Sequence, residues 1–447
     1  MDTPDFPETV YTDPARVTER VRRLLADRPS APPDWRDLIA AIDRVAHRWQ
    51  HPTDPERLRV IRDLHTVTGL HPTMLERILD VHLDYIRAEQ LQQLLRSEFG
   101  DPDIRSRFVP YGNHPDLWVH VTGSGLRVWW MPGNLPGPAL LAVVFSVLTG
   151  GPFLIRVSRY EPVLAPAFWH ALLAERPDLA SLGAIAWWSH EDTATTRTIL
   201  ARADTVIAYG HESTLDHLRT FVPGTARWLP YPHRISFAAI DRTAYRHRPI
   251  DDLAMHCAED IAWFDQQGCM SPHVIYLEGS PDAVLHFGDA LARALDHWEQ
   301  RWPRRTLSQG EAMRVQSFRA RWIGMDDTRI WMGANTTWTV VYTPQPDLAP
   351  TCTYRTVFLK PIADLKELPE ILHPHRHHLQ TMGYAIDRSW TDLALQLARL
   401  GVKRFCPIGR MQRPPLVGCH DGRPRLIDLV TYVQWEGREG KVTITNI

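Results

Sequence analysis

Apolar residues in the first hundred positions recur at the spacing of helices. In Asp34–Gln50 the residues Leu38, Ile39, Ile42, Val45 and Trp49 fall on one face of a helix. Two further stretches, Pro14–Asp27 and Thr73–Arg96, are amphipathic in the same way. We therefore expect a block of helices over residues 12–100, with no catalytic motif of its own.

From about Phe108 onward, short apolar and β-prone runs alternate with helical stretches. The expected strands are Leu117–Thr122, Leu126–Met131, Phe153–Val157, Ala184–Trp188 and Thr205–Tyr209. The expected helices are Pro138–Thr149, Val163–Glu175, Thr193–Arg202 and Ser213–Phe221. This alternation predicts a parallel α/β sheet, in which ligands bind beyond the carboxyl ends of the strands. Residues at those ends include Asn134, Arg156–Arg159 and Gly210–Thr214.

The alternation restarts after Phe237. Helices are expected at Ile250–Asp265, Pro281–Trp302 and Ser389–Leu400, and strands at Val274–Leu277, within Thr328–Tyr342 and at Thr356–Pro361. A strand-rich tail follows. The chain has no visible internal repeat or low-complexity segment.

The bulk composition narrows the class of protein. The chain has 447 residues, 44% of them hydrophobic, which predicts two or three globular domains. Its formal net charge of -2 gives no indication of a nucleic-acid partner. Its five scattered cysteines include no CxxC pair, which argues against a disulfide framework and against a zinc ribbon. The N-terminus lacks the pattern of a secretory signal, and the most apolar window, Pro138–Thr149, is too short to cross a bilayer. A cytoplasmic location is the expectation.

One cysteine stands in a distinctive setting, the stretch Phe264–His273 with the sequence F-D-Q-Q-G-C-M-S-P-H. Gly268 permits a sharp turn before Cys269, and Pro272 restricts the residue that precedes it. The stretch therefore predicts a helix–loop–strand junction in which a side chain is both rigid and reachable. A buried structural cysteine is the alternative, since free cysteines are usually buried.

Several stretches together resemble the LuxC-like acyl-CoA reductases, the fatty acid reductase family of the aldehyde dehydrogenase superfamily. They are P-G-N after a strand, R-V-S-R, A-D-T-V-I-A-Y-G-H-E-S-T, H-R-I-S-F, D-Q-Q-G-C-M-S-P and G-V-K-R-F-C-P-I-G-R-M-Q. The resemblance covers about residues 105–435. It implies an aldehyde dehydrogenase-like α/β fold with a Rossmann-type cofactor domain and an α/β catalytic domain. The implied segments are residues 1–106 (helical), 107–238 (NADP(H)-binding), 239–420 (catalytic) and 421–447 (C-terminal tail).

The resemblance also implies catalytic roles. Cys269 would attack an acyl thioester and form an acyl-cysteine, which hydride from a nicotinamide converts to an aldehyde. The side chain of Asn134 and the backbone N–H of Cys269 would stabilise the oxyanion, although Asn134 is also a natural turn residue. His233 is a candidate proton donor or acceptor, and a structural or phosphate-contacting role is equally open to it. Cys257 is a second cysteine of interest, without a neighbouring glycine.

The implied cofactor is NADPH, with NADH as the alternative. By resemblance, Arg156, Ser158 and Arg159 lie where the superfamily meets the adenosine ribose, and Arg159 replaces the carboxylate of NAD-preferring members. A cation there suits a 2′-phosphate. Solvated arginines are the plain alternative. Gly210, His211 and Ser213 open a helix, a reasonable place for a pyrophosphate.

Ordinary aldehyde dehydrogenases carry a glutamate that activates water, and here the matching stretch H-R-I-S-F-A-A-I has no carboxylate before Asp241. This favours a reductase. The expected acyl donor is acyl-CoA, an acyl-carrier-protein thioester or an acyl group handed over by an acyl-protein synthetase, and a homo-oligomer is expected. The alternatives are an acid-forming aldehyde dehydrogenase and a non-reducing acyl-transfer subunit.

The cluster His373-Pro-His375-Arg-His377-His378 invites a metal site. A proline and an arginine interrupt the histidines, so we expect a solvated loop and no metal.

Overall fold

The computed structural model describes residues 10–27, 33–114 and 116–437. Two compact units share the chain, and each is described by itself. The first comprises residues 1–67, 78–232 and 415–447, and the second comprises residues 68–77 and 233–414. Residues 1–9, 28–32, 115 and 438–447 lie outside the described residues. They include the first residues of the expected helical segment 1–106 and the last residues of the expected tail 421–447.

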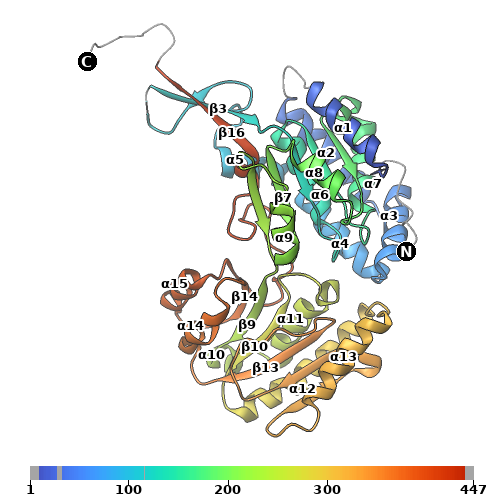
Figure 1. Ribbon diagram of the computed structural model, residues 1–447. Helices are drawn as coiled ribbons and strands as arrows, with labels where there is room; N and C mark the ends of the chain where they lie inside the picture. Colours follow the sequence, from blue (N-terminus) through green and yellow to red (C-terminus); the bar gives the residue numbers. More distant parts are fainter. Residues whose placement is uncertain (1–9, 28–32, 115, 438–447) are drawn as a thin grey trace. The chain divides into compact units, whose positions relative to one another are not determined.

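The first unit is built on a six-stranded parallel sheet (Figure 1). In spatial order its strands are β1 (Val10–Tyr11), β6 (Gly183–Ala186), β5 (Phe153–Arg156), β4 (Arg127–Trp130), β7 (Thr205–Tyr209) and β8 (Arg227–Tyr231). From β6 onward this is the order 3-2-1-4-5 of a doubly wound sheet. The strand order reverses between β4 and β7, and crevices that bind ligands form at such reversals.

Helices cover both faces of this sheet. They are α1 (Pro14–Ala26), α2 (Trp35–Gln50), α3 (Pro55–Thr68), α4 (Pro72–Tyr85), α5 (Ala88–Phe99), α6 (Pro138–Thr149), α7 (Leu164–Glu175), α8 (Thr193–Leu200) and α9 (Glu212–Arg219), with the 3-10 helix η1 (Pro177–Ser181). The first residues of α4 are grouped with the second unit. One core joins α1, α8 and α9 to Val128, Leu154 and Val206 of the sheet. Helix α6 is buried along nearly its whole length, because almost all of its residues are apolar.

A small antiparallel sheet also belongs to the first unit. It contains β2 (Val109–Pro110), β3 (Leu117–Gly123) and β16 (Val430–Glu436), and β16 is preceded by η6 (Ile427–Leu429). The C-terminal tail therefore pairs with a strand more than three hundred residues earlier. By compactness, the helical N-terminal segment and the tail group with the first sheet. The four-segment division by function stays a prediction.

The second unit is built on a seven-stranded sheet. Its order is β11 (Arg329–Met332), β12 (Thr339–Tyr342), β13 (Thr356–Ile362), β10 (Pro272–Glu278), β9 (Ile235–Ile240), β14 (Leu379–Ala385) and β15 (Arg404–Pro407). Only the pair β11–β12 is antiparallel. The six strands from β12 to β15 therefore begin at one edge of the sheet and end at the other.

Two helical layers enclose this sheet. Helices α11 (Ile250–Ala262) and α12 (Pro281–Arg301) share a core with Ile275, Leu277 and Val357 on one face. Helices α14 (Leu368–Leu372) and α15 (Thr391–Leu400) share a core with Val274 and Phe358 on the other. The remaining helices are α10 (Arg242–His247), α13 (Gln309–Trp322), η2 (Trp263–Gln266), η3 (Ala334–Thr336), η4 (Leu365–Glu367) and η5 (His373–His375).

The expected alternation is confirmed, and two details differ. The stretch Thr73–Arg96, predicted as one helix, is two helices, because Arg87 is extended. Asp43 of α2 accepts hydrogen bonds from the backbone N–H of Ala88 (2.8 Å) and from Arg87 (2.6 Å), which caps α5 from a distant segment. Helix α13 and the strands β8, β9 and β14 are among the elements that were not predicted.

Candidate active site

Cys269 lies in a tight turn between η2 and β10. The backbone N–H of Ser271 donates to the carbonyl of Gly268 at 3.0 Å and closes this turn. The Cys269 side chain is half-buried. The helix–loop–strand junction predicted from the sequence is thus confirmed, and its cysteine is partly open to solvent.

The three residues at the end of η2 adopt a left-handed conformation. Phe264, Asp265 and Gln266 have φ values of 53°, 51° and 63°. For residues other than glycine such a conformation costs roughly 1–2 kcal/mol each, so the surroundings must hold it in place. The backbone leading into the turn that contains Cys269 is therefore fixed by tertiary contacts.

A buried ion pair supplies one of those contacts. Arg355, 1% exposed at its side chain, lies 2.7 Å from the carboxylate of Asp265, which is fully buried. The same guanidinium lies 2.7 Å from Glu299 and donates to the carbonyl of Trp302 at 2.7 Å. Asp265 also accepts the backbone N–H of Arg305 at 3.1 Å. Removing one partner of such a pair leaves a buried charge, so this contact fixes the turn firmly.

Two glutamines tie the same turn to the start of β13. The amide oxygen of Gln266 accepts the N–H of Thr356 at 2.6 Å, and its NH₂ group donates to the carbonyls of Thr356 (2.7 Å) and Pro272 (2.9 Å). The NH₂ group of Gln267 donates to the hydroxyl of Thr353 at 3.0 Å. The D-Q-Q motif is therefore a structural clamp before the cysteine.

A third set of contacts holds the cysteine backbone itself. The buried hydroxyl of Ser236 donates to the carbonyl of Cys269 at 2.8 Å and accepts the N–H of Thr381 at 3.2 Å. The side-chain amide of Gln412 donates to the hydroxyl of Ser271 at 2.8 Å. The residues Ser236 and Gln412 come from the motifs H-R-I-S-F and I-G-R-M-Q, so three separate motifs converge on one turn.

Two histidines of this unit, His233 and His273, lie near the turn of residues 268–271 that contains Cys269. His233 is exposed and precedes β9, whose first residues pair with the start of β10. His273 is buried, and its Nδ1 accepts the backbone N–H of Thr351 at 3.0 Å. Burial, with a smaller contribution from the neighbouring His233, lowers the pKa of His273 to about 4. His273 is therefore neutral near pH 7, and of the two histidines His233 is the exposed one.

Asp241, the first carboxylate after H-R-I-S-F, lies at the wrong end of the sheet to act on Cys269. It follows β9, whereas Cys269 precedes the parallel strand β10. Six residues at about 3.3 Å each separate the two edges by roughly 17–20 Å. Asp241 accepts the N–H of Ala244 at 2.7 Å and caps α10.

The other cysteines are in different environments. Cys257, considered above as a second cysteine of interest, is buried in α11, and burial raises the pKa of its thiol well above the usual value. Burial also raises the pKa of Cys352 and brings that of Cys406 to about 12. Cys419 is exposed.

In the first unit, the predicted residues gather at the carboxyl edge of the sheet. Asn134 is exposed in the bend between β4 and α6. Its neighbour Gly133 packs so closely on Ser158 and Tyr160, which follow β5, that an added Cβ would lie 2.1 Å from the Ser158 hydroxyl oxygen. The bends after β4 and β5 therefore form one continuous surface.

The two arginines of R-V-S-R differ in position. Arg156 is buried, its guanidinium lies 3.8 Å from the centre of the Trp130 ring, and it donates to the carbonyl of Trp188 at 2.8 Å. Burial lowers its pKa to about 9. Arg159 is exposed, and its guanidinium lies 4.7 Å from the centre of the Tyr160 ring. Arg159 thus presents the more accessible cation.

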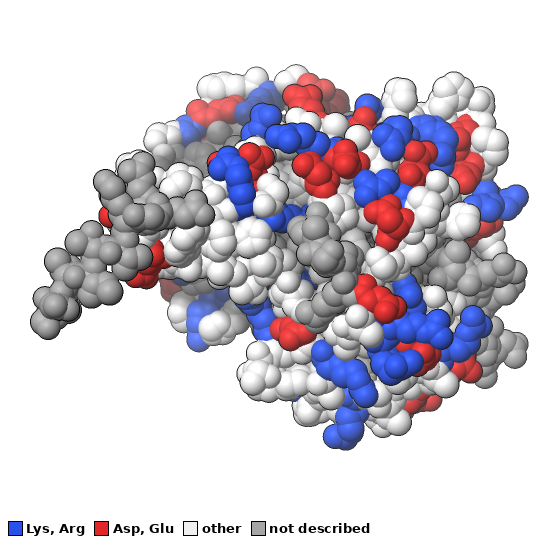
Figure 2. All heavy atoms as spheres, turned by 90° about the horizontal axis from the view of Figure 1, so that it is seen from above, with Lys and Arg blue, Asp and Glu red and all other residues white. Residues whose placement is uncertain are grey.

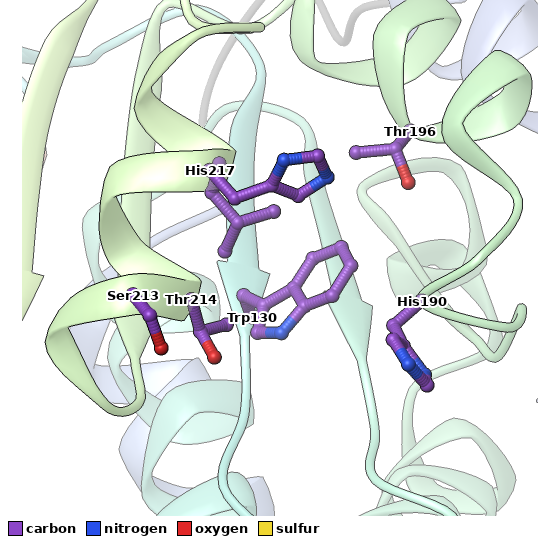
Figure 3. Close-up of a pocket in the computed structure, with 7 residues that line it drawn as sticks. Trp130, His190, Thr196, Ser213, Thr214 and His217 are labelled. Atoms are coloured by element: carbon purple, nitrogen blue, oxygen red, sulfur yellow. The ribbon is translucent and has the colours of Figure 1, made fainter.

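A cavity of about 200 Å³ opens where the strand order reverses (Figure 3). The indole of Trp130 lies between His217 and Thr214 on one side and His190 on the other. Gly210 and His211 precede α9, and Ser213 lies in its first turn. The full lining is Trp130, His190, Thr196, Ser213, Thr214, His217 and Leu218. Of the predicted cofactor residues, Ser213 lines this cavity.

The histidine cluster forms a short 3-10 helix and turn before β14. His373, Arg376 and His377 are exposed. Among the described residues, no group of three or more histidine, cysteine, aspartate or glutamate side chains is arranged to hold a metal ion.

The predicted residues therefore fall into two sets. Cys269 and His233 lie at the amino edge of the second sheet, and Asn134, Ser158, Arg159 and Ser213 lie at the carboxyl edge of the first. Sequence reasoning missed the supporting residues Asp265, Arg355 and Ser236. It also missed Trp130, His190 and His217. Ser236 could have been singled out, since it lies inside a recognised motif.

The surface charge and the length of the helices bear on the kind of surroundings that the protein suits. On the face shown in Figure 2, Lys and Arg side chains are interspersed with Asp and Glu. None of the helices in the described part of the chain is long and apolar enough to span a membrane.

Comparison with known proteins gives consistent matches. The family model of acyl-CoA reductase (LuxC) matches residues 30–432. The long-chain acyl-protein thioester reductase 2 of Photobacterium leiognathi is 24% identical over 89% of this chain and 82% of its own length, and the long-chain acyl-protein thioester reductase of Aliivibrio fischeri has the same values. In fold, the chain is similar to aldehyde dehydrogenase 21 from Physcomitrella patens (TM-score 0.75, 12% identity, 96% and 92% of the two chains). It is also similar to the Delta-pyrroline-5-carboxylate dehydrogenase of Mycobacterium tuberculosis (TM-score 0.71, 13%, 100% and 90%). The expected aldehyde dehydrogenase-like fold is confirmed.

Proposed function

The chain belongs to the acyl-CoA reductase (LuxC) family, and from this premise we propose that it reduces an acyl thioester to an aldehyde with NADPH through an acyl-Cys269 intermediate. The named relatives are reductases of long-chain acyl-protein thioesters, which supports a thioester whose acyl group is carried by a protein. Acyl-CoA is the second donor to test. An acyl-protein synthetase as the supplier, a homo-oligomeric state and a cytoplasmic location stay predictions.

The observation that carries this proposal is that the carboxylates near Cys269 in the sequence are engaged in structural contacts. Asp265 is buried against Arg355, four residues before Cys269. Asp260 is buried in α11 and accepts the backbone N–H groups of Gly409 (2.6 Å) and Met411 (3.0 Å). Both carboxylates are held by these contacts, and Glu259 beside Asp260 lies 3.0 Å from Arg413, so all three are engaged in structural contacts and not in activating water. This favours a reductase over an acid-forming dehydrogenase.

In the proposed reaction Cys269 acts as the nucleophile. Its thiolate attacks the thioester carbonyl, a new C–S bond forms, and the carrier thiolate leaves with a proton donated by His233. The contacts of Asp265, Gln266 and Ser236 hold the turn, so that the backbone N–H of Cys269 is kept in position to donate to the developing oxyanion. Once the acyl carbon has received a hydride, its oxyanion re-forms the C=O bond while the C–S bond to Cys269 breaks. The aldehyde is released and the Cys269 thiolate is restored.

The first unit offers a fitting place for a nicotinamide cofactor. The cavity lies at the reversal of strand order and presents an indole face, two imidazoles and three hydroxyls, a set that suits one heterocyclic ring and its ribose. When bound, the cofactor supplies the hydride that reduces the acyl carbon. The residues of this cavity that would hold it are Trp130, Ser213 and Thr214.

Arg159 supports the choice of NADPH. Its exposed guanidinium has the charge and the donor groups for charge-assisted hydrogen bonds to a 2′-phosphate. Arg156, whose guanidinium is stacked on Trp130, would act on the cofactor only by shaping the cavity. NADH stays the alternative.

Intact-mass measurement tests the proposal. With acyl-carrier-protein thioester or acyl-CoA, the wild-type protein should gain one acyl group, which NADPH should discharge as aldehyde. Cys269→Ala should gain none, whereas Cys419→Ala, a change at an exposed cysteine, should behave as wild type. Acylation that persists in Cys269→Ala, or discharge as carboxylic acid without NADPH, would contradict the proposal.

A further inference from the structure

The amino ends of four neighbouring parallel strands bring the nucleophile turn beside two basic segments. Strands β10, β9, β14 and β15 are adjacent and parallel (Figure 1). Cys269 precedes β10, the histidine cluster His373–His378 precedes β14, and Lys403 precedes β15. All of these segments therefore lie along the same edge of the sheet.

Direct contacts confirm this arrangement. The guanidinium of Arg404 lies 3.6 Å from the sulfur of Met270, the residue after Cys269. Arg404 also donates to the carbonyls of Met411 (2.7 Å) and Arg410 (2.8 Å). The N–H of Ile235 donates to the carbonyl of His378 at 2.7 Å, which joins the histidine cluster to β9.

This edge carries uncompensated positive charge. Arg376, Lys403 and Arg410 are exposed and Arg404 is half-buried. Within the described part of the chain, none of the four side chains forms an ion pair. We call these four residues, with the exposed or half-buried His373, His375 and His377, the basic edge.

Several other surface arginines of the same unit form ion pairs. Arg248 pairs with Asp387, Arg293 with Asp251 (2.8 Å) and Arg329 with Asp289 (3.0 Å). In the sequence, the carboxylate nearest to the histidine cluster is Glu370, three residues before His373. The basic edge thus combines a local excess of positive charge with direct proximity to the nucleophile turn.

We propose that the basic edge docks an acidic protein that carries the acyl thioester to Cys269. The inference rests on the proposed function, because a protein-borne thioester must approach the nucleophile with a whole protein surface. Complementary charge beside the reactive sulfur orients such a partner and raises the rate of encounter. A small thioester without a carrier needs no such surface.

A double charge reversal tests the docking surface. Arg376→Glu/Lys403→Glu should raise the KM for a long-chain acyl carrier protein thioester at least tenfold and leave kcat unchanged. The KM for a neutral acyl-N-acetylcysteamine thioester should not change. Arg301→Glu/Arg321→Glu, two exposed arginines of α12 and α13, makes the same change in net charge and should leave the KM for both donors unchanged.

Two outcomes would overturn the docking proposal. One is an unchanged KM for the carrier-protein thioester in the edge variant. The other is an equal rise in KM for acyl-CoA, since the edge would then bind phosphate groups of the donor itself. Measuring the KM for acyl-CoA, beside the KM for the carrier-protein thioester and the neutral thioester, shows whether the edge recognises a carrier protein or the phosphate groups of coenzyme A.

A binding measurement keeps the docking separate from the chemistry. Fluorescence anisotropy of labelled acidic carrier protein against Cys269→Ala should show binding at low salt that weakens as salt rises, and the edge reversal should abolish it. If wild-type protein makes no aldehyde from any donor, the proposed function fails. Binding to Cys269→Ala that the edge reversal leaves intact overturns the docking surface alone.

Discussion

The hydroxyl of Ser236 lies 2.8 Å from the carbonyl oxygen of Cys269 and donates a hydrogen bond to it. The same hydroxyl accepts the N–H of Thr381, at a point where the pairing of β9 with β14 shifts register between Leu379 and Met382. One serine therefore lies at an irregularity in the sheet and holds the backbone of Cys269, the proposed nucleophile.

Ser236→Ala should slow acylation of Cys269 without changing the KM for the thioester. The variant loses one hydrogen bond and leaves the buried N–H of Thr381 without its acceptor, at a cost of about 1–3 kcal/mol in the free energy of unfolding. Stopped-flow acylation should be about five- to tenfold slower, as expected for about 1 kcal/mol of lost positioning. Ser389→Ala, at an exposed serine, is the control. An unchanged acylation rate in Ser236→Ala would remove Ser236 from the positioning set.

Arg355→Met should destabilise the second unit by about 3–5 kcal/mol, because it leaves Asp265 buried without its cation. The double variant Asp265→Leu/Arg355→Met should recover a large part of that loss, since both charges are then removed. Denaturant unfolding monitored by tryptophan fluorescence measures both effects. A double variant that is less stable than either single variant would show that the ion pair contributes more than mutual neutralisation.

The stability of the protein should depend on pH through His273. Its pKa in the folded state is about 4, below the ordinary value near 6.5, so the unfolded state takes up the proton first as pH falls. The contribution of neutral, buried His273 to the free energy of unfolding is therefore fully present above pH 6.5 and is lost as the pH falls from 6.5 to 4. It amounts to about 3 kcal/mol.

Comparison with His273→Gln isolates this contribution from other buried groups, such as His420, whose pKa burial also lowers to about 4. Glutamine can still accept the N–H of Thr351 but does not titrate. Between pH 6.5 and 4 the wild type should lose more unfolding free energy than the variant. Parallel pH profiles would show that His273 is not the titrating group.

Several elements of the first unit could be predicted from the sequence, because apolar runs bounded by turns identify strands and helices directly. Pro138–Thr149 and Thr205–Tyr209 have the bounds that their residues predict. Helix α13 also had a readable signal, the capping box formed by Ser308 and Glu311.

The contacts that fix the site could not be read in this way. Asp265 and Arg355 are 90 residues apart, and nothing local in either segment shows that they pair. The break between α4 and α5 likewise depends on Asp43, a residue of another helix. Such contacts appear only when strands and helices are placed in three dimensions, and they decide which of the candidate residues are held rigidly.

Arg159→Glu should shift the preference for the cofactor from NADPH toward NADH. A carboxylate repels the 2′-phosphate and can accept hydrogen bonds from a free ribose diol. Loss of a charge-assisted hydrogen bond costs about 1.5–3 kcal/mol, so kcat/KM with NADPH should fall about 10- to 100-fold relative to the value with NADH. Arg202→Glu, an exposed arginine after α8, should leave the ratio unchanged. If Arg159→Glu leaves that ratio at its wild-type value, the exposed cation after β5 does not read the 2′ position, and another residue must set any preference.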